Sequence, residues 1–166
     1  MTTSRILASG TVQDVASKLK SAQQTVAVAE SSTAGLISAS LLAMPGASAY
    51  FMGGSVIYTL ASRKEILGVT RDDVAGLEPL TEAMVMRFAE KARAQLDTTW
   101  AVAELGVAGP TGARYGHPPG ISVLAVDGPV KLTKTVTTGS SDREANMWAF
   151  TEEAIELLAS ALEQNV

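Results

Sequence analysis

A turn rich in hydroxyl groups follows a short apolar run near the N-terminus. Residues 26–29 (Val-Ala-Val-Ala) lack polar alternation, which indicates a strand buried on both faces, and the turn Glu30-Ser31-Ser32-Thr33 follows directly. Residues 33–44 then show helical spacing of apolar side chains. A strand that feeds a helix in this way places hydroxyls and backbone N–H groups where open α/β folds bind ligands. Either the hydroxyls cap the helix, or one of them, on Ser31, is a nucleophile.

A serine nucleophile needs a base, and the sequence offers few. His117 is the single histidine, and it stands beside two prolines in a long loop. Arg63 and Lys64 follow the apolar run at residues 52–59 and could supply a cation for a serine–lysine arrangement. Tyr58, near the end of that run, either lines a pocket close to Ser31 or is an aromatic core residue with a polar tip.

A glycine-rich loop spans residues 106–120. Loops of this length inside a compact domain are usually functional, and glycine-rich backbone can form anion-binding nests. The glycine spacing fits neither a P-loop nor a dinucleotide-binding motif. Arg143, at the start of the last predicted helix, either holds a phosphate or is a surface arginine.

Composition excludes several classes of function. The chain has 166 residues, of which 46% are apolar and 18% charged, and this predicts one ordered domain spanning residues 1–166. The net charge of −4 argues against a nucleic-acid or membrane-surface partner. With no cysteine and one histidine, we expect no disulfide, no thiol nucleophile and no metal site. No apolar run is long enough to span a membrane, so we expect a cytoplasmic protein, and the high apolar content favours a homo-oligomer.

Strand and helix patterns alternate along the chain. We predict strands at residues 26–29, 52–59, 100–105, 121–126 and 130–137, the last two joined by an Asp-Gly turn, and helices at residues 11–22, 33–44, 62–67, 81–96 and 142–162. We expect Thr11 to cap the first helix, and the last to bury Ala145, Trp148, Ile155, Leu158 and Leu162. This order predicts an α/β fold, a three-layer α/β/α sandwich around a mixed sheet.

Five segments together resemble a known family. They are Ala29-Glu30-Ser31-Ser32-Thr33-Ala34-Gly35-Leu36, Pro45-Gly46-Ala47-Ser48, Gly54-Ser55-Val56-Ile57-Tyr58 running on to Leu67-Gly68-Val69, Gly106-Val107-Ala108-Gly109-Pro110, and Asp142-Arg143-Glu144. In the same order they are similar to the motifs of the CinA (competence-damage-inducible) C-terminal domain family, the nicotinamide-nucleotide amidohydrolases or NMN deamidases.

The resemblance implies hydrolysis of the carboxamide of nicotinamide mononucleotide, giving nicotinate mononucleotide and ammonia, without a metal or other cofactor. It implies Ser31 as the nucleophile, and Tyr58 as a residue that either assists it or positions the substrate. The substrate-binding residues would be Glu30, Ser32, Thr33, Gly54, Gly106, Ala108, Gly109 and Arg143. The helix start at Ser32 and Thr33 would offer backbone N–H groups to the developing oxyanion.

The sequence also departs from the family pattern. The family's lysine falls on Arg63, which is always protonated and cannot be a general base. Either Lys64 reaches into the site from the next position, or base catalysis is lost. Leu105 and Met147 stand where polar residues are often found. Two alternatives to the amidohydrolase therefore stay open: a catalytically silent or altered-substrate member that binds a nucleotide or a protein partner, and a serine hydrolase acting on another small amide.

Overall fold

A computed structural model describes residues 9–165. Five strands form one sheet in the order β2-β1-β3-β4-β5. The strands are β1 (Val26–Glu30), β2 (Phe51–Val56), β3 (Trp100–Val107), β4 (Ile121–Asp127) and β5 (Leu132–Thr137). β1 pairs in parallel with β2 and β3, whereas β4 pairs antiparallel with β3 and β5. The predicted mixed sheet and its β4–β5 hairpin are confirmed.

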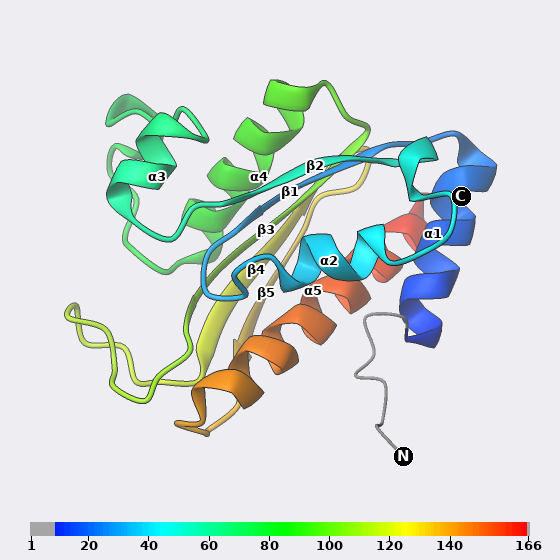
Figure 1. The fold of residues 1–166 in the computed structure, drawn as a ribbon. Coiled ribbons are helices and arrows are strands. Elements are labelled where there is room, and N and C mark those ends of the chain that lie inside the picture. The colour runs from blue at the N-terminus through cyan, green and yellow to red at the C-terminus, as the bar shows by residue number, and fades with distance from the viewer. Residues whose placement is uncertain (1–8, 166) are drawn as a thin grey trace, which may run out of the picture.

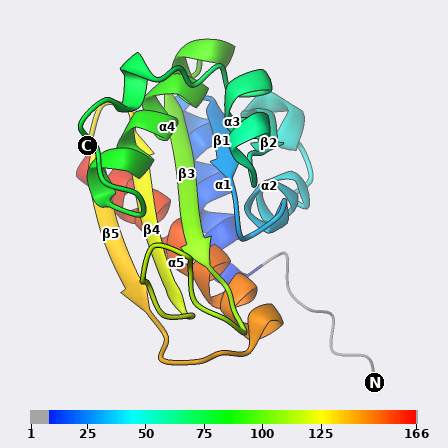
Figure 2. The ribbon, with the colours of Figure 1, turned by 90° about the vertical axis from the view of Figure 1, so that its left-hand side faces the viewer.

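Helices cover both faces of the sheet (Figures 1 and 2). The α-helices are α1 (Gly10–Ala22), α2 (Leu36–Leu42), α3 (Leu60–Glu65), α4 (Glu82–Leu96) and α5 (Arg143–Gln164), and two short 3₁₀ turns lie at Ala47–Ala49 and Asp72–Val74. One apolar core joins α1, α2 and α5 to one face of the sheet. A second core joins α4 to the opposite face. The α/β/α sandwich predicted from the sequence is therefore correct.

The two faces follow from the alternation of side chains along each strand. On β1, Val26 and Val28 point into the core under α1, α2 and α5, while Ala27 and Ala29 point toward α4. Every residue of β1 is buried, as expected for a central parallel strand. Glu30 ends this strand on the same alternation as Val26 and Val28, so its side chain faces α2.

Two predicted helix starts differ in the structure. Ser9, not Thr11, is the N-cap of α1, and its Oγ accepts from the Val12 N–H. α2 begins at Leu36, not at residue 33, and its N-cap is Gly35 with φ of 98° and no side-chain cap bond of its own. The hydroxyl residues before it form a turn instead of a cap, because the carboxylate of Glu30 binds the N–H groups at this helix start.

The buried face of α5 also differs in its first turns. Ile155, Leu158 and Leu162 are buried as predicted, but Ala145 is exposed and Trp148 is half-buried. Asn146 is buried in place of Ala145. Because Asn146 is polar, a search for apolar spacing does not identify it as part of the buried face of α5. Its hydrogen-bond partners lie at the candidate site.

Candidate active site

Two glutamates stand side by side near the carboxyl ends of the central parallel strands. Glu30 of β1 and Glu104 of β3 occupy paired positions in the register. Both side chains are fully buried. A buried carboxylate is costly unless donors surround it, so the contacts of these two residues define the site.

Glu30 organises the turn and the start of α2. Its Oε1 accepts from the backbone N–H of Gly35 at 2.7 Å and of Ile37 at 3.1 Å. Its Oε2 accepts from both the N–H and the hydroxyl of Ser38, at 2.9 and 2.8 Å. These bonds satisfy the N–H groups that a helix start leaves free, and the negative charge sits at the favourable end of the helix.

Glu104 is held by the turn itself. Its Oε2 accepts from the N–H groups of Ser31 at 3.0 Å and Thr33 at 3.2 Å. Its Oε1 accepts from the Ser32 hydroxyl at 2.5 Å and lies 2.9 Å from Ser122 Oγ. Burial raises the pKa of the Glu104 carboxyl above its ordinary value, against the opposing effect of these hydrogen bonds.

A cavity of about 360 Å³ opens beside Ser32, the residue whose hydroxyl contacts Glu104. It lies where β3 ends and the 108–120 loop begins, an edge that is visible in Figure 2. Its lining includes Ser32, Tyr58, Arg143 and the loop residues 106–109 and 111–115. Ser31 is not part of this lining; its backbone N–H binds both the Glu104 carboxylate and the Glu104 carbonyl. Of the two serines of the turn, Ser32 is therefore the one that lines the cavity.

Gly106 makes room for the cluster. A Cβ at this position would lie 2.4 Å from Ser32 Oγ, 2.6 Å from Glu104 Oε1 and 3.0 Å from Ser122 Oγ. Because these contacts are closer than van der Waals distances allow, any side chain at position 106 would separate the three groups.

Two residues of α5 fasten the glycine-rich loop to the rest of the site. The Arg143 guanidinium donates to the Gly109 carbonyl through Nη1, and its Nη2 lies 3.3 Å from Tyr58 Oη. One turn along, Asn146 Nδ2 donates to the carbonyls of Ala108 at 2.8 Å and Ser140 at 2.9 Å. The loop, α5 and the segment after β2 therefore meet at Arg143.

Other residues predicted for the site lie elsewhere. Lys64 is exposed and pairs with Glu65 at 3.0 Å. Arg63 lines a separate cavity of about 600 Å³, where its guanidinium lies 5.4 Å from the centre of the Phe88 ring. Burial lowers the pKa of Arg63, while electrostatic interactions with Tyr115 and Glu104 raise it, so its charge still acts on the glutamate.

Gly54 and His117 also fall outside the lining of the Ser32 cavity. A Cβ on Gly54 would lie 2.1 Å from Ser38 Oγ, which shows that this glycine serves the close approach of α2 to β2. The His117 ring makes an edge contact with Tyr115 at 5.5 Å between centroids.

Of the two backbone N–H groups expected to receive an oxyanion, those of Ser32 and Thr33, that of Thr33 is already engaged. Thr33 N–H donates to Glu104, and the N–H groups of Gly35, Ile37 and Ser38 donate to Glu30. The expectation is therefore wrong for the Thr33 N–H, and for the Ser32 N–H it stays a prediction. The two buried carboxylates take the place of an external anion.

Sequence reasoning missed Glu104, Ser122 and Asn146. Glu104 lies inside an apolar run, and a glutamate at a position that strand alternation marks as buried was the available signal. Ser122 occupies the buried start of β4 and Asn146 the inner face of α5. Neither residue has a sequence signal of its own, because the role of each depends on a contact made in the fold: Ser122 with the Glu104 carboxylate and Asn146 with the Ala108 carbonyl.

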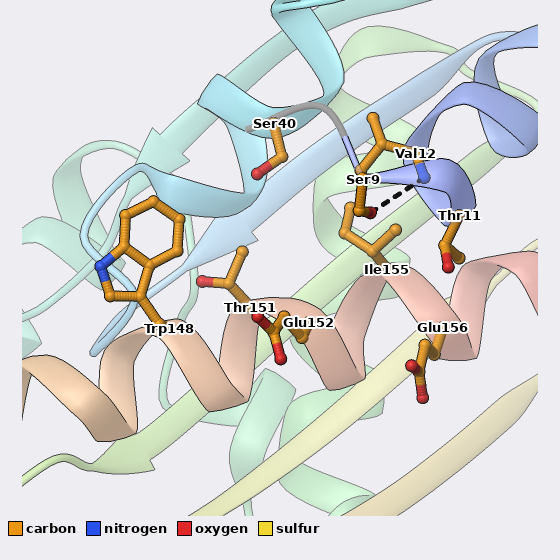
Figure 3. Close-up of a pocket in the computed structure, with 9 residues that line it drawn as sticks. All are labelled: Ser9, Thr11, Val12, Ser40, Trp148, Thr151, Glu152, Ile155 and Glu156. Atoms are coloured by element: carbon orange, nitrogen blue, oxygen red, sulfur yellow. Dashed lines mark hydrogen bonds between the residues drawn. The ribbon is translucent and has the colours of Figure 1, made fainter. Parts of the chain in front are cut away.

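A third cavity, of about 200 Å³, lies between the start of α1, α2 and α5 (Figure 3). Ser9, Thr11, Ser40 and Thr151 line it with Trp148, Ile155 and the acidic side chains of Glu152 and Glu156. Its lining shares no residue with the Ser32 cavity.

Among residues 9–165, no cluster of three or more His, Cys, Asp or Glu side chains could hold a metal ion, and no helix is long and apolar enough to cross a membrane.

The fold and the turn at the carboxyl edge agree with a family comparison. The sequence pattern of the CinA C-terminal domain matches residues 9–162. The chain belongs to this family. The CinA-like protein of Parasynechococcus marenigrum is 40% identical over 111 residues, which cover 67% of this chain and 26% of that protein. The CinA-like protein of Acaryochloris marina is 32% identical over 120 residues, covering 72% of this chain and 29% of that protein. The chain therefore matches somewhat over a quarter of the length of these curated relatives.

Solved structures of the CinA superfamily share the whole fold. Competence damage-inducible protein A (ComA) of Klebsiella pneumoniae is similar with a TM-score of 0.84 and 25% identity, covering 92% of this chain and 95% of that one. The competence/damage inducible protein CihA of Agrobacterium tumefaciens gives a TM-score of 0.82 and 26% identity, covering 92% and 96%. The CinA arrangement of sheet and helices thus extends over nearly all of this chain.

Proposed function

We propose that this CinA-family domain is an amidohydrolase that acts on the carboxamide of nicotinamide mononucleotide. The observation that carries the proposal is that Ser32 lines a cavity whose wall also includes Arg143 and the glycine-rich loop. The Ser32 hydroxyl is hydrogen-bonded to the buried Glu104 carboxylate, and a serine beside a base can attack an amide carbonyl. An arginine side chain and the backbone N–H groups of a glycine-rich loop are typical partners of a phosphate. The products are nicotinate mononucleotide and ammonia.

The size of the cavity supports a small substrate. At about 360 Å³ it falls in the range of sites that enclose small molecules. Arg143, Arg114 and the nearby charge of Arg63 favour an anion, which a nucleotide phosphate supplies. Tyr58 gives an aromatic wall on which a pyridine ring can stack.

Ammonia release tests the proposal. Purified protein is incubated with nicotinamide mononucleotide, nicotinamide riboside and nicotinamide, and ammonia is measured for each. We expect release from the mononucleotide, weaker release from the two compounds that lack the phosphate, and none from the Ser31→Ala/Ser32→Ala double variant. Ser40→Ala is the matched control, because Ser40 is a buried serine of α2 outside this cavity. Equal ammonia from wild type and double variant would refute the function.

A further inference from the structure

We infer that Ser32 is the nucleophile of this site and that Glu104 is its general base. The inference rests on the proposed amidohydrolase function and names the groups that carry it. It assigns the reaction to the second serine of the turn and to a carboxylate, in place of Ser31 and a lysine. Three observations support it: the place of Ser32 in the cavity lining, the position of the carboxylate and the loss of the lysine.

The first observation concerns access. Ser32 lines the cavity that also exposes Tyr58 and Arg143, and Ser31 does not. A nucleophile has to reach the substrate carbonyl, so the cavity selects between two adjacent serines. The backbone N–H of Ser31 instead binds Glu104, which makes this residue part of the support for the carboxylate.

The second observation concerns the carboxylate. A general base has to lie within hydrogen-bond reach of the proton that it takes, and Glu104 Oε1 lies 2.5 Å from Ser32 Oγ. The N–H groups of Ser31 and Thr33 fix the other oxygen, Oε2. Ser122 Oγ also lies 2.9 Å from Oε1, and Gly106 leaves the space in which the three groups meet. The carboxylate is thus oriented before any substrate arrives.

The environment of Glu104 suits the task. Burial raises the pKa of this carboxyl, and a carboxylate with a raised pKa is a stronger base than an exposed one. Arg63 lies within electrostatic range and remains protonated, so it can balance the negative charge but cannot accept the serine proton. Lys64 pairs with Glu65 at the surface and is absent from the cavity lining. The base of this site is therefore a carboxylate.

The steps balance as follows. Ser32 Oγ forms a bond to the amide carbon while its proton passes to Glu104 Oε1. The tetrahedral intermediate breaks its C–N bond, and the same proton passes to the leaving nitrogen, which departs as ammonia. Water then attacks the acyl-serine and gives a proton to Glu104. Cleavage of the ester bond returns that proton to Ser32 Oγ and releases the carboxylic acid.

Covalent labelling identifies the reactive serine without the natural substrate. A small alkyl fluorophosphonate forms a P–O bond with an activated serine and loses fluoride, and peptide mass spectrometry locates the modified residue. We expect the wild-type label on Ser32, retained in Ser31→Ala and absent in Ser32→Ala. A label on Ser31, or no label on either serine, overturns the inference even if ammonia release is observed. A label on Ser32 without ammonia release from the mononucleotide supports the pair and refutes only the proposed substrate.

The role of Glu104 is tested by the rate of labelling. In Glu104→Gln the side chain keeps its size, and we expect labelling of Ser32 to slow by about a hundredfold or more, the scale of general-base catalysis. Glu104→Asp should recover part of the rate, because it restores a carboxylate. Circular dichroism and urea unfolding identify a variant that fails to fold, and in that case the wild-type label position decides the assignment of the nucleophile. Labelling of folded Glu104→Gln at the wild-type rate contradicts the role of the base.

Discussion

Glu30 and Glu104 stand at paired positions of neighbouring parallel strands, and they bind opposite ends of one turn. Glu30 binds the N–H groups that lead into α2, and Glu104 binds those of the preceding residues. Thr33 joins the two, since its Oγ1 lies 2.8 Å from Glu30 Oε1 and 3.3 Å from Glu104 Oε2. The turn that presents Ser32 is therefore set by two buried carboxylates.

The first prediction concerns the stability that Glu30 provides. Glu30→Gln removes the charge and replaces one acceptor oxygen with a donor, which leaves N–H groups at the start of α2 without a partner. We expect the free energy of unfolding to fall by about 2–4 kcal/mol in urea denaturation. Glu163→Gln, at an exposed pair with Lys18, should cost less than about 1 kcal/mol. Equal losses in both variants would contradict the account.

The second prediction concerns Gly106. Gly106→Ala places a methyl group against Ser32 Oγ and Glu104 Oε1, and we expect it to cost about 1–3 kcal/mol of stability through overpacking. It should also abolish labelling of Ser32, since the hydroxyl and the carboxylate are forced apart. Gly10→Ala is the control, because a Cβ there meets nothing within 4 Å. A Gly106→Ala protein with wild-type labelling would show that the contact between Ser32 and Glu104 is not needed for the reaction.

The third prediction concerns Arg143. Arg143→Lys keeps the charge but loses the planar fork that reaches both the Gly109 carbonyl and Tyr58. We expect KM for the nucleotide to rise about tenfold, the effect of one lost charge-assisted hydrogen bond, with a smaller change in kcat. Steady-state kinetics beside Arg87→Lys, at a surface pair with Glu90, measure the difference. A change in kcat alone would place Arg143 outside substrate binding.

The fourth prediction concerns pH and Glu104. Because burial raises its folded-state pKa above the unfolded value, the folded protein holds this proton more tightly than the unfolded chain. The contribution of Glu104 to the free energy of unfolding is therefore most favourable below the ordinary glutamate pKa and is lost as pH rises through the raised one. Glu104→Gln should remove this part of the slope in urea titrations across that window. An unchanged slope in the variant would show that Glu104 does not titrate there.

Much of the fold could be predicted from the sequence. The five strands and the antiparallel β4–β5 hairpin follow local apolar patterns, and the structure has them within a few residues. The start of α2 could not be predicted in this way. Ser31 to Thr33 have the right chemistry for a cap, but the capping group is the carboxylate of Glu30, which the strand aims at α2 from outside the helix.

The candidate site could be predicted only where it is local in sequence. The turn at Ser31 and Ser32, the glycine-rich loop and Arg143 were identified, and the structure brings Ser32, the loop and Arg143 to one cavity. Glu104 and Asn146 were missed because their importance depends on contacts with residues 72 and 38 positions away in the chain. Such contacts arise only when β3 and α5 are placed beside the turn.

Ammonia release by the two single serine variants tests the central claim most directly. Wild type, Ser31→Ala and Ser32→Ala are assayed with nicotinamide mononucleotide at one enzyme concentration, with Ser40→Ala as the control. The account predicts that Ser32→Ala falls to the level of the double variant, while Ser31→Ala releases ammonia at a measurable rate well above it. Loss of activity in Ser31→Ala with retention in Ser32→Ala would contradict the account.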